Sequence, residues 1–142
     1  SFSGWVKAER VLRFEAFIEQ ADSGSRRSQW RVGFGPMAGF QWGLSAWNNA
    51  WKDYVINREF PRDEWVHMAV VADQSLGHVT CYFNGEEAGQ VDQVFPFSPT
   101  EKPVLIGCKA NGDHFQGKLA GVRLYNRALS PAEVQALYGL QE

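Results

Sequence analysis

Short segments in which apolar and polar residues alternate recur along almost the entire chain. In one of them Trp30, Val32 and Phe34 fall on one face of an extended strand, and the residues between them fall on the other. Because successive side chains of a β-strand point to opposite faces, this alternation predicts sheets with one face in a core and one wetter face. Asn84 and Gly85 between two such segments favour a tight hairpin. The expected strands cover residues 2–8, 13–20, 28–35, 39–47, 53–60, 65–73, 77–85, 86–93, 102–110 and 117–128.

One helix is expected near the end of the chain. Ser130 stands at the N-cap position, with Glu133 three residues later and a proline between them, which is a capping box. Gly139 ends the helix. Val134 and Tyr138 share one helix face, so the helix should pack on the strands. Ten short strands and one short C-terminal helix predict an all-β fold, a two-sheet antiparallel sandwich.

Length and charge limit the classes of function. A chain of 142 residues favours one domain. Its formal net charge is −2 and it has no basic run, which argues against nucleic acid or an anionic membrane as the partner. No apolar stretch approaches the roughly 20 residues of a membrane-spanning helix. The first residues, SFSGWVKAER, already resemble a strand and show no signal peptide, so we expect a piece cut from a longer protein.

The acidic residues do not predict an enzyme. Glycoside hydrolases hold two carboxyl groups roughly 5–9.5 Å apart on one face. Glu15 and Glu19 lie four positions apart, too far along a strand for a close pair, and the adjacent Glu86 and Glu87 point to opposite faces. His67 lies inside an apolar strand and is expected to be packed rather than catalytic.

The two cysteines, Cys81 and Cys108, each lie in an expected strand. A pair permits one disulfide but does not require it, and two buried thiols explain the pattern as well. Both alternatives stay open from the sequence.

Three segments together resemble a known family. These are the opening FSGWVKAE, the central EWVHMAVVADQSLGHVTCYFNGEEAG and the closing VLIGCKANGDHFQGKLAGVRLYNRALSPAEVQALY. They are similar to the laminin-G-like, or concanavalin A-like lectin/glucanase, domain family, loosely in the first 60 residues and strongly from Trp65 onward. The resemblance implies a concanavalin A-like jelly roll of two curved antiparallel sheets, one of them concave. It also implies an extracellular or periplasmic module of a larger protein, commonly a carbohydrate-active one.

The chain departs from the family pattern in two places. Relatives usually begin with one or two further strands that carry Phe-Asp-Gly, so residues 1–142 are expected to form a single laminin-G-like domain that lacks them. Many relatives hold calcium with acidic residues where this chain has Ala120 and Gly121. We therefore expect no cofactor. Asp73, Asn111 and Asp113 stay open as calcium ligands, although turn chemistry explains them equally well.

The six tryptophans divide into two groups. Four of them, Trp5, Trp30, Trp42 and Trp65, are expected in the core. Trp47 falls on the polar face of its strand, and Trp51 is expected in the loop that follows. An indole can stack on the C–H face of a sugar ring, while amides and carboxylates reach its hydroxyl groups. The predicted ligand-binding residues are Arg26, Gln29, Arg31, Trp47, Asn48, Asn49, Trp51, Asp53 and Tyr54.

The predicted function is a non-catalytic carbohydrate-binding module of a larger exported protein. Glycan would bind on the concave face and the adjoining aromatic loop. Arg26 and Arg27 would serve a ligand that carries carboxylates or sulfates. The alternative is a protein–protein interaction or spacer module without glycan affinity, in which the same aromatics cover the sandwich or face a neighbouring domain.

Overall fold

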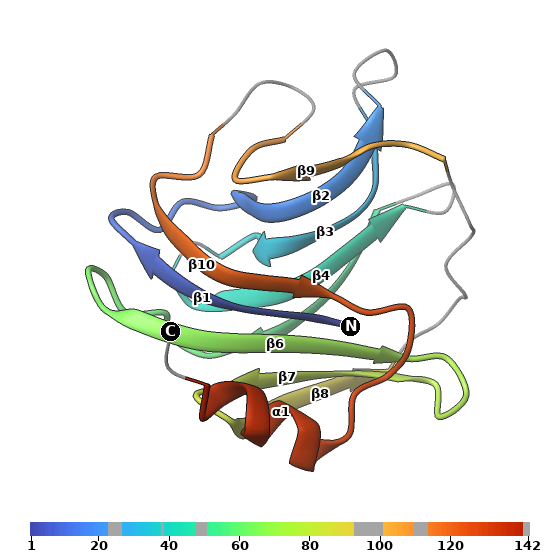
Figure 1. Cartoon of the computed structure of the whole chain (residues 1–142). Helices are drawn as coiled ribbons and strands as arrows, with labels where there is room; N and C mark the ends of the chain where they lie inside the picture. Colours follow the sequence, from blue (N-terminus) through green and yellow to red (C-terminus); the bar gives the residue numbers. More distant parts are fainter. Residues whose placement is uncertain (23–26, 38, 48–50, 93–100, 110–113, 141–142) are drawn as a thin grey trace.

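The computed structural model describes all residues except 23–26, 38, 48–50, 93–100, 110–113 and 141–142 (Figure 1). Among the strand residues, the side chains of 21, 22, 27–29, 47 and 51 are also outside the description. The described elements are β1 (Phe2–Ala8), β2 (Ala16–Asp22), β3 (Arg27–Phe34), β4 (Gln41–Trp47), β5 (Trp51–Asn57), β6 (Trp65–Asp73), β7 (His78–Phe83), β8 (Glu86–Asp92), β9 (Val104–Ile106), β10 (Gly117–Leu124) and α1 (Pro131–Tyr138).

The strands form two five-stranded antiparallel sheets that pack face to face (Figure 1). One sheet has the order β10-β1-β6-β7-β8, and we call it the helix-side sheet because α1 packs on its outer face. The other has the order β5-β4-β3-β2-β9, and we call it the far sheet. The predicted two-sheet antiparallel jelly-roll sandwich with one C-terminal helix is confirmed.

Turn geometry explains where the strands end. Asn84 and Gly85 both adopt positive φ angles, 50° and 83°, which give the predicted tight hairpin between β7 and β8. β9 is much shorter than expected because Gly107, with a φ of 76°, turns the chain away after Ile106. β5 begins at Trp51 rather than at Asp53, so the expectation that Trp51 lies in a loop is wrong.

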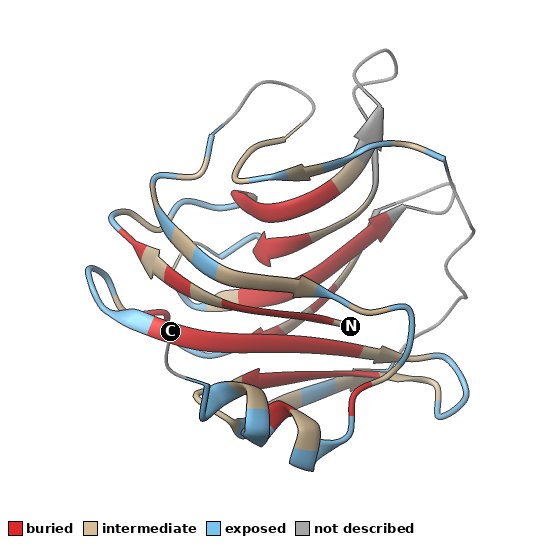
Figure 2. Cartoon of the chain, viewed as in Figure 1, coloured by how far each residue is buried: buried red, intermediate tan, exposed pale blue. Residues whose placement is uncertain are grey.

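Aromatic and aliphatic side chains of both sheets fill the space between them. Phe60 lies within 5.3 Å of Phe34 and 6.2 Å of Trp42, ring centre to ring centre, with near-perpendicular rings. Buried residues continue across both sheets (Figure 2). The largest fully buried apolar side chains are Trp42, Tyr54, Phe2, Phe17, Phe34, Ile18 and Met68.

A second apolar cluster attaches α1 to the helix-side sheet. Val134 of the helix packs with Val71, Tyr82 and Leu129, all of them buried. The burial of these four side chains against one another stabilises the packing of the helix on the sheet. In the described part of the chain, no helix is both long enough and apolar enough to cross a membrane.

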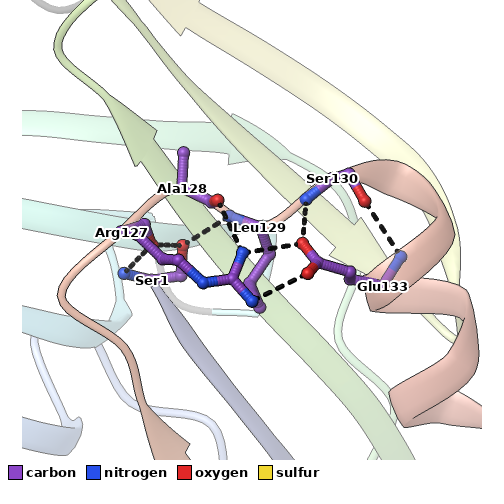
Figure 3. Close-up of polar contacts among 6 residues, drawn as sticks. All are labelled: Ser1, Arg127, Ala128, Leu129, Ser130 and Glu133. Carbon is purple, nitrogen blue, oxygen red and sulfur yellow. Dashed lines mark hydrogen bonds and ion pairs between the residues drawn. The ribbon is translucent and has the colours of Figure 1, made fainter.

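Polar contacts fix the start of α1 (Figure 3). The predicted capping box is present: the Glu133 backbone N–H donates to Ser130 Oγ over 3.2 Å, and the Ser130 N–H donates to Glu133 Oε2 over 2.8 Å. Arg127 adds two hydrogen bonds to the Glu133 carboxylate. Ser1 Oγ donates to the Arg127 carbonyl and accepts from the Leu129 N–H, which ties β1 to the segment before the helix.

The expectation that four tryptophans lie in the core is only partly right. Trp42 is fully buried, and Trp30 packs against the core while its indole N–H donates to Gln20 Oε1 over 2.8 Å. Trp5 lies on the outer face of the helix-side sheet, between His67 and Tyr138. Trp65 is 43% exposed, because its position in β6 has the parity of the outer face.

Both cysteines are free thiols. Cys81 is buried between the sheets, and this burial raises the pKa of its thiol to about 12. Cys108 is half-buried after β9. Of the two alternatives left by the sequence, the structure supports thiols without a disulfide.

His67 is buried on the outer face of the helix-side sheet, beneath the end of α1. Its Nε2 lies 3.0 Å from Ser3 Oγ, and its ring lies 5.3 Å from Trp5 and 5.9 Å from Tyr138. Burial, together with the positive charge of Arg123, lowers the pKa of His67 to about 4. The predicted packing role of this histidine agrees with its surroundings.

We predict that mild acid destabilises the fold through His67. The pKa of His67 in the fold, about 4, lies below its ordinary value of 6.5. The neutral ring therefore stabilises the fold fully above about pH 6.5, and this stabilisation is lost as the pH falls from about 6.5 towards about 4. Between about pH 7 and about pH 5, the free energy of unfolding should fall by about 2 kcal/mol in urea denaturation. The pKa of Glu133 is lowered from 4.5 to about 2, so protonation of that carboxylate reduces the free energy of unfolding mainly below about pH 4.5. An equal fall in a His67→Gln variant would contradict the assignment.

Candidate functional site

A row of polar side chains crosses the outer face of the far sheet. The antiparallel register places Glu19 of β2 opposite Arg31 of β3, Arg31 opposite Ser45 of β4, and Ser45 opposite Asp53 of β5. We call these four residues the polar row. Each of the four has a neighbour along its strand that is buried in the core, so the outward direction of the row follows from the pleat.

The polar row is linked by hydrogen bonding and charge. Ser45 Oγ donates to Asp53 Oδ1 over 2.6 Å. Burial lowers the pKa of the Arg31 guanidinium, and the carboxylates of Glu19 and Asp53 oppose that shift. The guanidinium also lies 5.2 Å from the centre of the Phe14 ring. Glu19 and Ser45 are only 1% and 3% exposed, whereas Arg31 and Asp53 are partly accessible, so solvent reaches the row at these last two side chains.

The spacing of the row does not suit hydrolysis. Glu19 and Asp53 stand on β2 and β5, which are three strand intervals apart, or about 14 Å. A glycosidase pair needs roughly 5–9.5 Å. Glu15, the other buried carboxylate on this side, is engaged by Arg10 Nη2 over 2.9 Å. Of these carboxylates only that of Asp53 is accessible to a ligand, as a hydrogen-bond acceptor, and none forms a pair with the spacing of a catalytic acid and base.

Two of the predicted binding residues, Arg31 and Asp53, lie in the polar row. β3 pairs with β4 as the prediction required. Trp47 and Trp51 occupy directly opposed positions at the end of the β4–β5 pair. Their side chains, that of Gln29, and all of Arg26, Asn48 and Asn49 lie outside the description.

Tyr54 does not belong to the site. It is fully buried in the core, opposite Leu44. The prediction placed it beside Asp53 because the two are adjacent in sequence. Adjacent strand residues point to opposite faces, so only Asp53 shares the outer face with Ser45.

The sequence did not single out Glu19, Ser45 or Phe14 as site residues. A register irregularity between Ala16 and Ile18 breaks the alternation in β2, so the outward direction of Glu19 was hidden. Phe14 adopts a φ of 62°, a conformation that strand patterning does not anticipate. Ser45 did show the polar parity of its strand, and that signal could have found it.

The described residues contain no cluster of metal-ligating side chains. Within the described ranges, no three side chains of His, Cys, Asp or Glu lie close enough together to hold an ion. Asp73 Oδ1 accepts hydrogen bonds from Ser75 and Leu76, as in an ordinary turn. Asn111 and Asp113 lie outside the described residues, and the expectation of no cofactor stays a prediction.

A cavity bordered by described residues lies elsewhere, between the sheets at one end of the sandwich. It measures about 590 Å³, and Phe2, Val32 and Leu44 form part of its wall. Each of these three is at most 5% exposed. Leu124 and Arg127, both exposed, form another part of its wall, so the cavity opens to solvent at this end of the sandwich.

Comparison with known proteins identifies the family. A model of the concanavalin A-like lectin/glucanases superfamily matches residues 1–135. The chain belongs to this superfamily. The resemblance noted in its strand motifs is therefore confirmed. None of the curated protein sequences compared with this concanavalin A-like domain matched it.

Three solved structures illustrate its likeness in fold. Domain 4 of AbnA, an extracellular arabinanase from Geobacillus stearothermophilus solved with arabinotriose, is 25% identical with a TM-score of 0.74; the match covers 96% of this chain and 65% of that one. A candidate carbohydrate binding protein from Bacteroides ovatus is 18% identical with a TM-score of 0.72, over 94% and 39%. The botulinum neurotoxin type G receptor binding domain is 14% identical with a TM-score of 0.63, over 97% and 37%. The chain thus spans less than two thirds of these relatives.

We predict that the two carboxylates of the polar row differ in their effect on stability. Glu19→Ala should lower the free energy of unfolding by about 3 kcal/mol, because it removes a fully buried partner of Arg31. Asp53→Ala should cost about 1 kcal/mol or less, because its surroundings are more accessible to water. Urea denaturation of both variants measures the difference. A loss at Asp53 equal to that at Glu19 would contradict the burial argument.

Proposed function

We propose that this concanavalin A-like domain is a non-catalytic module that binds carbohydrate within a larger exported protein. The observation that carries the proposal is the polar row, which leads along β4 and β5 to the opposed positions of Trp47 and Trp51. Those two positions are two residues beyond Ser45 and two before Asp53. The pleat therefore predicts both indoles on the face of the row.

The proposed site combines a flat apolar surface with polar groups beside it. The indoles would stack on the C–H face of a sugar ring, and Arg31 and Asp53 would hydrogen-bond its hydroxyl groups. The proposed binding residues also include positions close in sequence to Arg31 or to the two tryptophans: Arg26, Gln29, Asn48 and Asn49. Because the strands fix the polar row before the ligand arrives, binding would need little reordering there.

The likeness to other proteins supports this function. The arabinanase domain was solved with arabinotriose and belongs to an extracellular enzyme. The superfamily and the similar structures consist largely of binding domains, which agrees with a non-catalytic role. By analogy, the proposed partners are a glycan and neighbouring domains of the parent protein, and the proposed location is extracellular or periplasmic.

A second function is favoured by one flank of the sandwich. β9 and β10 are the edge strands on that side, and Val104, Ile106 and Leu124 on them are 42–57% exposed. Exposed apolar residues on edge strands are typical of protein contacts. In this alternative the domain is an interaction or spacer module, and the purified chain would show no glycan affinity.

We predict that Trp47→Ala and Trp51→Ala each reduce glycan affinity by at least about fivefold without loss of fold, because each removes a stacking surface worth about 1 kcal/mol or more. A glycan array would find the ligand, and tryptophan fluorescence titration would measure the affinity.

Trp65→Ala is the matched control. It removes an exposed indole from the outer face of the helix-side sheet and should leave affinity unchanged. Full affinity in both Trp47 and Trp51 variants would eliminate the proposed site.

A further inference from the structure

The charges of the polar row do not favour an anionic ligand. Its single cation, Arg31, stands between the carboxylates of Glu19 and Asp53, and both act on it electrostatically. One positive and two negative charges leave the row with a net charge of −1. Arg10, before β2, forms an ion pair with Glu15, so that pair adds no net charge.

The described outward positions of β4 and β5 likewise carry no cation. Gln41 donates from its side-chain amide to Asn57 Oδ1 over 2.8 Å, so an uncharged amide pair lies at the opposite end of this surface from the tryptophan positions. The outward residues described between the two ends are Gly43, Ser45, Asp53 and Val55. Amides, a hydroxyl and a carboxylate donate to and accept from sugar hydroxyl groups, which themselves do both.

We infer that the ligand of this face is a neutral glycan, and that Glu19 and Asp53 make the site discriminate against carboxylated or sulfated sugars. An anionic group brought near Arg31 would also approach two carboxylates, and like charges at close range oppose binding. Asp53 is the more accessible of the two carboxylates, so it repels an anionic ligand more strongly than Glu19 does. This inference rests on the proposed function. It differs from the expectation that Arg26 and Arg27 would serve an anionic ligand, which stays a prediction because Arg26 and the side chain of Arg27 lie outside the description.

Affinity electrophoresis and calorimetry on the purified chain test the inference. The neutral probes are linear arabinan, xylan and mixed-linkage β-glucan, and the anionic probes are polygalacturonate and dextran sulfate. At least one neutral polymer should bind at least tenfold more tightly than either anionic one. Its affinity should not change between low and high salt, because no counterions are released.

The binding results distinguish failure of the inference about ligand charge from failure of the proposed carbohydrate-binding function. An anionic polymer that binds as tightly as any neutral one, with affinity that falls in salt, would overturn the inference and leave carbohydrate binding in place. Binding of none of the polymers would overturn the proposed function, and the inference with it.

A charge variant gives a second readout. Glu19→Gln with Asp53→Asn removes both carboxylates at nearly constant volume and should increase dextran sulfate binding at least fivefold. Asp53→Asn alone should give a smaller increase, and it serves if the double variant does not fold. The control Glu86→Gln removes an exposed carboxylate on β8 of the other sheet and should have no effect. No increase in either Asp53 variant would contradict the inference.

Discussion

The antiparallel register of β2, β3, β4 and β5 is the constraint on which the site depends. Backbone hydrogen bonding alone brings the four residues of the polar row opposite one another. The alternate positions of the same strands, Leu44 and Tyr54 among them, are buried against the helix-side sheet. A slip of one residue would exchange the two faces and expose the core, so the packing that stabilises the sandwich also fixes the direction of the row.

Opposite charges and a ring contact stabilise the partly buried Arg31 and set the net charge of the row. A guanidinium removed from water is tolerated only when carboxylates and ring faces surround it, and Arg31 has both. The same carboxylates that stabilise Arg31 cancel its attraction for anions. Stability and ligand preference thus have one electrostatic origin, which differs from the simple expectation that an arginine in a sugar site favours an acidic sugar.

Alternation of residue types predicted the sandwich and the polar face on which Arg31 lies, and the capping residues predicted the terminal helix. It failed where a local feature interrupts the pleat. The irregularity in β2 hid Glu19, and the two asparagines that follow Trp47 in the sequence made Trp51 look like a loop residue, although β5 begins there. The alternation of side chains also does not predict which element covers an outer face. Trp5 and Trp65 both lie on the outer face of the helix-side sheet, but Tyr138 of α1 packs on Trp5, whereas Trp65 is exposed.

The most direct test is a map of backbone amide chemical shifts while the tightest-binding neutral oligosaccharide is added. The largest changes should fall in β3, β4 and β5 around Arg31, Ser45 and Asp53, with little change in β6 to β8. Changes centred on the β9–β10 flank, or none with any sugar, would contradict the central claim that the outer face of the far sheet holds the ligand.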